Sequence, residues 1–350
     1  MKSSQKKRLQ SDLRISAILS IIITFIFALQ IVPIPMGAGV TVLTMLVFMV
    51  LLVIFLILIN PSLIQLVREQ FELKPLYVLL FSSSLYLIFL IYATLLNKIT
   101  IFDILSGFLY CILPLILIWF ARNQSMSLKT MDILVLIILW FPINFRLVPQ
   151  LTLPPVQGIV PLFNIIAVIL LIIAFLVIRN LEDIGLVWRL KGDEIRISIQ
   201  YFIIGIFIII IIGFITGFFE LSKRLPSTFE MLGMFMSIGF FIALPEELLF
   251  RGIIQNFIEK SLQRHRYNTW IALAISAIIF GLAHGNDAIG PVIDVNLRSF
   301  GIWHCPWAYM IVATIAGIFY GLTYIKTRKV TAAALVHLLV NWFWMVLFNG

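Results

Sequence analysis

Charged residues are scarce in this chain of 350 residues: Asp, Glu, Lys and Arg make up 12% of it, whereas hydrophobic residues make up 62%. A soluble domain is typically about 25% charged. The mean hydropathy of +1.10 points in the same direction. No long hydrophilic stretch interrupts the sequence, which excludes an embedded soluble domain and predicts an integral membrane protein.

Cysteine is also scarce. Cys111 and Cys305 lie far apart and form no CxxC pair, which excludes a disulfide framework and a Cys-rich zinc site. Three catalytic patterns are missing as well: the HExxH helix of zinc peptidases, the GxSxG elbow of serine hydrolases and an obvious pair of intramembrane aspartates. Any chemistry must therefore come from a different arrangement.

Long apolar segments are what the chain has in abundance. Eleven of them reach or approach the length of about 20 residues that a helix needs to cross a bilayer. They occupy residues 15–32, 40–59, 76–96, 104–121, 131–148, 159–178, 196–219, 229–257, 268–284, 306–325 and 331–348. Pro142 interrupts the fifth segment. We interpret the first as an uncleaved helix rather than a signal peptide, because no clear A-x-A-like cleavage site follows it.

Lys and Arg are distributed unevenly between the predicted loops. With a cytoplasmic N-terminus and eleven alternating helices, 20 of the 25 Lys and Arg residues fall on the cytoplasmic side, as the positive-inside rule requires. We therefore predict an all-α, polytopic membrane helix bundle of about 11 transmembrane helices in the plasma or inner membrane of the cell. The net charge of +9 then reflects topology and contact with anionic lipids of the bilayer, and no nucleic acid is expected as a partner.

The sequence divides at its most polar interior stretch, Asn180–Glu194. Residues 1–195 are predicted to form an N-terminal membrane block of about six helices, and residues 196–350 a C-terminal block. The longest predicted loops are 60–75, 179–195 and 285–305. Small residues at four-residue spacing let membrane helices approach closely, and they gather in the C-terminal block, which we expect to be the tighter unit. These rows are Gly213 and Gly217; Ala277 and Gly281; and Ala313, Gly317 and Gly321.

Ionisable residues deep in apolar segments concentrate in the C-terminal block, beginning with Glu246, Glu247 and Arg251. Glu247 and Arg251 share a helix face and can pair. Glu246 points about 100° away and has no sequence-local partner. Because adjacent carboxylates in a low dielectric raise at least one pKa, Glu246 is a candidate general base. Pro245 removes a backbone hydrogen bond and can bend the helix. The alternative is a structural charge cluster at a helix end.

Two further groups contribute imidazoles. His284 follows Gly281 by less than a turn, and the glycine leaves room for a neighbouring helix or a ligand beside the ring. His337 and Asn341 are four residues apart and point the same way. The non-catalytic alternatives are an interfacial histidine and an interhelical hydrogen bond, which is worth about 1 kcal/mol.

Together the carboxylates, the imidazoles and the amide suit peptide hydrolysis. A carboxylate and one imidazole can hold and deprotonate a water, while the second imidazole and the amide donate to a developing oxyanion. Alternatively, Glu246, His284 and His337 can bind zinc with an open position for water. The residue types leave both a zinc cofactor and a metal-free site open.

Helix geometry raises one conflict. At about 1.5 Å per residue, Glu246, His337 and Asn341 fall in the cytoplasmic half of the bilayer, whereas His284 falls about 24 Å from the cytoplasmic end of its helix. We expect a tilt, a later helix start or a shifted boundary to bring His284 to the others.

These groups, in this order, resemble the signature of the CAAX-protease and bacteriocin-processing (CPBP, or Abi) family of intramembrane proteases. The similar motifs are Glu-Glu-x-x-x-Arg, Phe-x-x-x-His, beginning at Phe280, and His-x-x-x-Asn. The run Gly317–Thr327 is similar to the Gly- and Tyr-containing helix of that family, and the resemblance covers roughly residues 229–348.

The resemblance implies an all-helical membrane core and an endopeptidase that cleaves a membrane-associated or prenylated protein or peptide near the cytoplasmic face. It implies that Glu246 and His284 activate water, with Glu247 and Arg251 in support. His337 and Asn341 would stabilise the oxyanion. Members of the family are described both as metalloproteases and as metal-free glutamate proteases.

Three hypotheses for the function follow. The leading one is an intramembrane endopeptidase with catalysis in the last four helices. The second is a non-catalytic membrane immunity or scaffolding protein that keeps the polar cluster for folding. The third is an ion- or proton-coupled transporter that uses the cluster as a relay. A transporter more often shows two related halves, whereas here the ionisable residues concentrate in one half.

Overall fold

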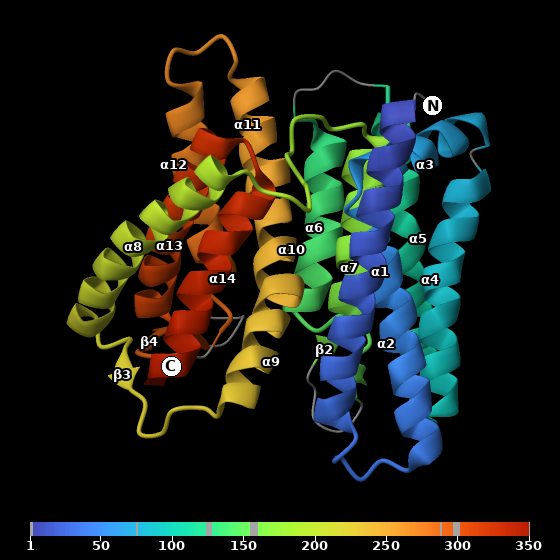
Figure 1. Cartoon of the computed structure of the whole chain (residues 1–350), viewed down its shortest axis with the longest axis horizontal. Helices are drawn as coiled ribbons and strands as arrows, with labels where there is room; N and C mark the ends of the chain where they lie inside the picture. Colours follow the sequence, from blue (N-terminus) through green and yellow to red (C-terminus); the bar gives the residue numbers. More distant parts are fainter. Residues whose placement is uncertain are drawn as a thin grey trace. The chain divides into compact units, whose positions relative to one another are not determined.

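The computed structural model describes residues 3–74, 76–123, 128–154, 160–287, 289–296 and 302–349. The chain forms two compact units, which we call the N-terminal unit (Met1–Glu182) and the C-terminal unit (Asp183–Gly350). Each is built almost entirely of helices (Figure 1), which confirms the predicted all-α membrane bundle. The chain passes from one unit to the other between Glu182 and Asp183, which lie inside the predicted polar divide. The assignment of 1–195 and 196–350 as domains stays a prediction.

The N-terminal unit is a bundle of helices of unequal length. Its helices are α1 (Ser3–Ile31), α2 (Ala38–Leu58), α3 (Pro61–Leu73), α4 (Leu76–Leu95), α5 (Ile101–Ala121), α6 (Thr130–Asn144) and α7 (Leu162–Leu171), and α7 continues as the π-helix η1 (Ile172–Ile178). A minor sheet pairs β1 (Thr152–Leu153) with β2 (Val160–Pro161) before α7.

Residues 60–75 do not form the loop that we predicted, because α3 occupies most of this stretch. Asn60 caps α3 by accepting from the N–H groups of Ser62 and Leu63, and Pro61 opens its first turn. The helix is short and amphipathic, burying Phe71 while Arg68 donates to the carbonyl of Leu176 at 2.6 Å. A search for long apolar runs cannot detect such a helix.

A buried ion pair joins α6 to the end of η1 in the N-terminal unit. Arg179 Nε donates to Asp132 Oδ1 at 2.8 Å, and both side chains are fully buried. Asp132 also accepts from the backbone N–H of Lys129 at the start of α6. Each charge thus has the partners that a buried ion needs, a pair that the sequence analysis did not single out.

The C-terminal unit contains the predicted site residues. Its elements are α8 (Gly192–Ile215), β3 (Glu220–Leu221), α9 (Thr228–Ile238), η2 (Gly239–Ala243), α10 (Leu244–Glu247), η3 (Leu248–Gln255), α11 (Asn256–Ser261), α12 (Asn268–Ala283), β4 (Ile293–Asn296), β5 (Ile302–Cys305), α13 (Trp307–Thr327), α14 (Val330–Leu347) and β6 (Phe348–Asn349). The strands form two small antiparallel sheets, β3 with β6 and β4 with β5. The predicted loop 285–305 therefore contains a hairpin.

One long broken helix crosses this unit as α9, η2, α10, η3 and α11. It extends from Thr228 to Ser261, 34 residues, and its two π-helical stretches flank the turn that contains Pro245. Proline has no N–H to donate, which fits a local change in the helical hydrogen-bond pattern. Widened turns of this kind are frequent at functional sites.

The α13 helix is the best-enclosed span of the unit. Buried residues make up 56% of its spanning window, compared with 22% for α8. Glycines allow its neighbours to approach: a Cβ at Gly281 of α12 would overlap the Thr314 side chain and the Met310 carbonyl, and a Cβ at Gly317 would press against Phe280. The space beside Gly281 is therefore filled by a neighbouring helix, as the small-residue rows predicted.

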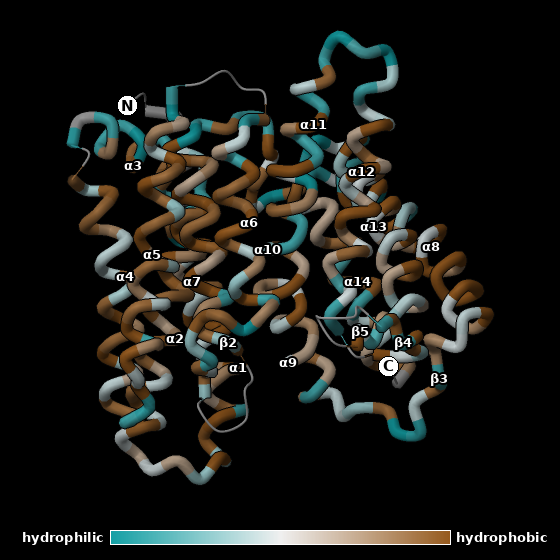
Figure 2. Tube along the Cα trace, turned by 180° about the vertical axis from the view of Figure 1, so that it is seen from behind, coloured by the Kyte–Doolittle hydropathy of each residue, from teal (hydrophilic) through white to brown (hydrophobic). Residues whose placement is uncertain are grey.

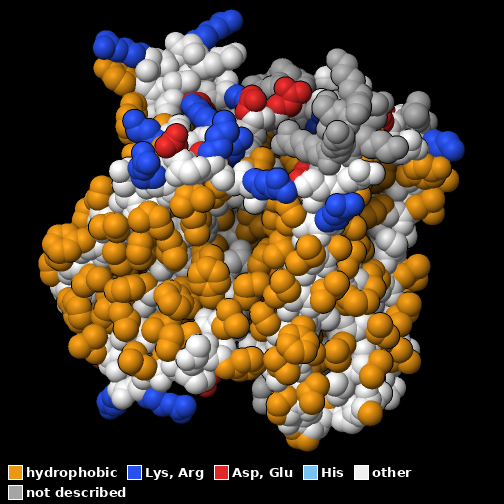
Figure 3. Space-filling view, in the orientation of Figure 1, with side chains coloured by type: hydrophobic (Ala, Val, Ile, Leu, Met, Phe, Trp, Pro, Cys, Tyr) orange, Lys and Arg blue, Asp and Glu red, His pale blue; other side chains and the backbone are white. Residues whose placement is uncertain are grey.

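In the described part of the chain, eight helices are long and apolar enough to cross a membrane. Three shorter apolar helices, Thr130–Asn144, Leu162–Ile178 and Asn268–Ala283, match the fifth, sixth and ninth predicted segments. Hydrophobic helices alternate with hydrophilic turns such as the one between α11 and α12 (Figure 2). On the C-terminal unit, large apolar side chains cover the middle of the face seen in Figure 3, and Phe207 of α8 is 66% exposed. A soluble protein does not expose such a surface, so the chain is a multi-pass membrane protein; the exact number of crossings and the side of the N-terminus stay predictions.

Candidate active site

The carboxylates of the candidate site lie in the middle of the broken helix. Glu247 and Arg251 are fully buried. Arg251 Nη1 donates to Glu247 Oε1 at 3.0 Å, and its Nη2 donates to the carbonyl of Gly317 on α13 at 2.7 Å. The predicted i,i+4 pair is therefore present, and its two charges balance each other away from water.

Aromatic rings enclose the Arg251 guanidinium. Its central carbon lies 4.7 Å from the centroid of the Phe280 ring and 5.3 Å from that of Tyr320, within the range of cation–π attraction. Phe280 comes from α12 and Tyr320 from α13. One guanidinium thus ties three helices together and fixes the position of Glu247.

His337 on α14 connects Glu247 to Asn341. Its Nδ1 lies 2.9 Å from Glu247 Oε1, and the Asn341 amide nitrogen lies 3.1 Å from its Nε2. An amide nitrogen only donates, so Nε2 accepts, and Nδ1 carries the proton that it donates to Glu247. The Tyr320 ring stacks on the imidazole, with centroids 4.5 Å apart and planes 13° apart. Both nitrogens of His337 therefore have partners.

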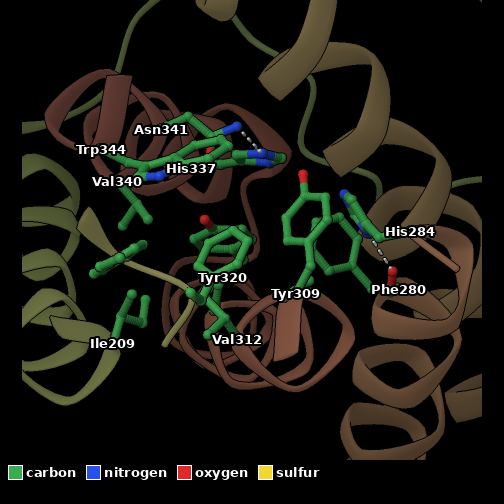
Figure 4. A pocket seen from close by; sticks show the side chains of 14 residues that line it. Ile209, Phe280, His284, Tyr309, Val312, Tyr320, His337, Val340, Asn341 and Trp344 are labelled. Carbon is green, nitrogen blue, oxygen red and sulfur yellow. Dashed lines mark hydrogen bonds between the residues drawn. The ribbon is translucent and has the colours of Figure 1, made fainter. Parts of the chain in front are cut away.

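His284 follows the last residue of α12, one turn beyond Phe280. Its Nδ1 lies 2.8 Å from the Phe280 carbonyl, which can only accept. Nδ1 therefore carries the proton, and Nε2 keeps its lone pair. The ring packs edge to face against Tyr309 of α13, with centroids 4.8 Å apart. This arrangement leaves His284 Nε2 as an acceptor beside the cavity in Figure 4.

The contacts of Glu259 on α11 resolve the predicted conflict in depth. Its carboxylate accepts from the Thr269 hydroxyl near the start of α12 at 2.7 Å and from Arg328 Nη1, in the turn between α13 and α14, at 2.7 Å. These ends of α11, α12, α13 and α14 therefore lie at the same depth. At about 1.5 Å per residue, Glu246 lies about 20 Å below this level, His284 about 22 Å and Asn341 about 20 Å. The error lay in the predicted helix boundary, because the broken helix continues to residue 261 rather than 257.

Glu246 is the carboxylate without a partner at bonding distance. Its side chain is 33% exposed, and its Oε2 lies 3.9 Å from His337 Nε2, which is too far for a hydrogen bond. Among the described residues nothing donates to this buried oxygen. Buried acceptors of this kind are normally satisfied by water or a ligand, so Glu246 is available to interact with a molecule that enters the site.

A cavity of about 40 Å³ lies beside these side chains (Figure 4). Its polar walls are His284, His337 and Asn341, and aromatic rings, Tyr309 and Trp344 among them, form much of the remainder. A water molecule takes up about 30 Å³ of the liquid. The cavity therefore has room for one water or one small polar group next to the imidazoles.

A comparison with known protein families gives a match to part of the chain. The family described as Rce1-like, "Type II CAAX prenyl endopeptidase Rce1-like", matches residues 228–343. We refer to this matching segment as the Rce1-like domain. The match agrees with the resemblance that the sequence motifs gave, and it supports protease activity in a multi-pass membrane protein. No curated protein and no solved structure matched the chain.

The Rce1-like domain brings all six predicted side chains into one cluster. Contacts join Glu247 to Arg251 and His337, and His337 to Asn341, while Phe280 packs between the rings of His337 and His284, at 5.7 and 4.9 Å. Their roles in catalysis stay predictions. The geometry adds three groups that the motifs did not identify as parts of the site: Tyr309, Tyr320 and the carbonyl of Gly317. A tyrosine in an apolar helix and a backbone carbonyl carry no distinctive sequence signal.

The predicted zinc ligands do not form a ready metal site. Among the described residues no group of three or more His, Cys, Asp or Glu side chains is close enough to hold a metal. Both nitrogens of His337 already have partners, which leaves Glu246 and His284 Nε2 as open donors to a metal. Two such groups fall short of the three protein ligands of a catalytic zinc, so no step below passes through a metal.

One further carboxyl lies at the edge of the Rce1-like domain's site. Asp287 follows α12, and its backbone N–H donates to the His284 carbonyl at 3.2 Å. Burial raises the pKa of Asp287. The loop after α12 thus places a carboxyl with a raised pKa next to a site imidazole.

Proposed function

We propose that the Rce1-like domain is the catalytic part of an intramembrane endopeptidase that uses Glu246 as its general base and needs no metal. The observation that carries the proposal is the state of Glu246. This carboxylate has no hydrogen-bond donor on its buried oxygen, although its neighbour Glu247 is neutralised by Arg251 at 3.0 Å. A general base must be within reach of the proton that it takes and free to accept it, and a carboxylate without a cation as partner is suited to this role.

The nucleophile in this proposal is a water held between Glu246 and His284. The water donates one hydrogen bond to the Glu246 carboxylate and the other to His284 Nε2, which leaves an oxygen lone pair for the scissile carbonyl carbon. As the new C–O bond forms, the water proton passes to Glu246 and the carbonyl oxygen becomes an oxyanion. When the C–N bond breaks, Glu246 gives this proton to the leaving amine. The products are a new carboxyl terminus and a new amine terminus.

The remaining residues position the groups that react. Arg251 fixes Glu247, Glu247 fixes the tautomer of His337, and His337 orients the amide of Asn341. Asn341 keeps a second N–H, which donates to the oxyanion. One well-placed donor of this kind contributes about 100- to 1000-fold to the rate.

The substrate in this proposal is a membrane-associated or prenylated protein or peptide, because the matching family is described as a CAAX prenyl endopeptidase. The protein resides in the plasma or inner membrane with its N-terminus in the cytoplasm, as the distribution of Lys and Arg predicts. Cleavage takes place inside the bilayer, at the depth that Glu246, His284 and Asn341 share, about 20 Å below Glu259.

A comparison of protein termini tests the proposal. Cells that express the wild type or Glu246→Gln at equal levels are compared by mass spectrometry of new termini in membrane proteins. Arg196→Gln serves as the matched control, because Arg196 is 73% exposed on α8 and lies outside the site. We expect a set of termini that is present with the wild type and Arg196→Gln and absent with Glu246→Gln. Identical termini in all three strains would exclude the endopeptidase hypothesis and favour the non-catalytic scaffolding hypothesis.

A further inference from the structure

Tyr309 is held rigidly at the wall of the cavity. Its ring stacks on Phe218, with centroids 5.1 Å apart and planes 11° apart, and the edge-to-face contact with His284 fixes it on another side. The residue lies in the first turn of α13, the best-enclosed span of the domain. Neither the motifs nor the family match assigns it a function.

The Tyr309 hydroxyl faces the reacting groups. Figure 4 shows it between the imidazoles of His337 and His284. No described residue forms a hydrogen bond with this hydroxyl, whereas Tyr324 on the same helix donates its hydroxyl to the Asp183 carbonyl at 3.0 Å. A tyrosine hydroxyl without a protein partner in a polar cavity is available to a ligand.

The residues of the sequence motifs leave few hydrogen-bond donors for a substrate. His337 uses its one N–H on Glu247, and His284 uses its one N–H on the Phe280 carbonyl. The Glu246 carboxylate only accepts. Asn341 uses one amide N–H on His337 and keeps one. A developing oxyanion is normally stabilised by more than one donor, so a second donor must come from the cavity wall. Trp344 Nε1 and the Tyr320 hydroxyl also lie on this wall, but the hydroxyl between the two imidazoles in Figure 4 is that of Tyr309.

We propose that Tyr309 is a further catalytic residue, whose hydroxyl donates a hydrogen bond to the oxyanion opposite the Asn341 amide. The hydroxyl keeps its proton throughout, because its task is to stabilise charge rather than to transfer a proton. The inference rests on the proposed endopeptidase function, because without hydrolysis there is no oxyanion to stabilise.

The substitution Tyr309→Phe removes the hydroxyl and preserves the ring that packs on Phe218 and His284. The substrate is a synthetic peptide that spans one cleavage site found by the comparison of termini. We expect kcat to fall about 100-fold or more, with KM within about threefold of the wild type and an unchanged Tm. Affinity for a phosphinic analogue of the same peptide, which mimics the tetrahedral oxyanion, should fall by a factor similar to that in kcat.

Tyr324→Phe is the matched control. It removes a hydroxyl that forms a hydrogen bond within the fold, to the Asp183 carbonyl. The Tm of this variant should therefore fall, while its kcat per folded molecule is retained. An unchanged kcat in Tyr309→Phe, or an equal loss of affinity for the peptide and for its phosphinic analogue, would overturn the assignment of Tyr309 alone. If wild-type cells show no termini that are absent from Glu246→Gln cells, the proposed function fails, and the assignment of Tyr309 fails with it.

Discussion

The ion pair between Glu247 and Arg251 should be strongly coupled in free energy, because it is buried among three helices. Arg251→Met leaves the Glu247 carboxylate buried without its cation and the Gly317 carbonyl without its donor. Removing one partner of a buried pair typically costs about 3–5 kcal/mol of unfolding free energy. Glu247→Gln should cost a similar amount of unfolding free energy, because it leaves the buried Arg251 guanidinium without its carboxylate partner. Replacing both side chains removes both charges, so the double variant should lie within about 2 kcal/mol of the wild type.

Equilibrium unfolding by SDS in mixed micelles measures this coupling as a double-mutant cycle. The matched control is the pair Asp193 and Arg196 on α8, 3.5 Å apart with side chains 86% and 73% exposed; its coupling should stay below about 0.5 kcal/mol. The reasoning is refuted if the two buried substitutions add within about 0.5 kcal/mol, because independent sites add in this way.

Two further predictions concern the surroundings of the site. Gly281→Ala should destabilise the protein by about 1–3 kcal/mol, because the added methyl group has no room beside Thr314. Gly192→Ala is the control, because a methyl group there meets open space and should leave Tm unchanged. Equal Tm values for the two variants would contradict this packing. Burial raises the pKa of Asp287. The stabilisation that comes with its protonated carboxyl is therefore fully present below the unfolded pKa of about 3.9. It is lost as pH rises through the folded pKa. Asp287→Asn should therefore have a higher Tm than the wild type at pH 7.5 and a similar Tm at pH 3.5, whereas a lower Tm at pH 7.5 would refute the burial of the charge.

The spanning helices could be predicted because hydropathy follows directly from residue type. The pairing of Glu247 with Arg251 followed from their spacing, since side chains four residues apart share a face. Local patterns of this kind need no knowledge of the partner helix. The same patterns missed α3, which is amphipathic and too short for a hydropathy search.

The three-dimensional details of the site depended on contacts between distant helices. The common depth of His284 and Glu246 follows from Glu259, which links three parts of the chain and cannot be recognised from sequence spacing. The protonation of His337 follows from its partners on two helices. Tyr309 is one of nine tyrosines, and the position of its hydroxyl between the two imidazoles distinguishes it.

Incorporation of oxygen from water tests the central claim most directly, namely that Glu246 activates a water that hydrolyses a peptide bond. The purified protein is reconstituted in liposomes and incubated in ¹⁸O-labelled water with a peptide that spans a site from the comparison of termini. We predict that the wild type places one ¹⁸O atom in each new carboxyl terminus and that Glu246→Gln yields no product. Product without label, or labelled product from Glu246→Gln at the wild-type rate, would contradict the account.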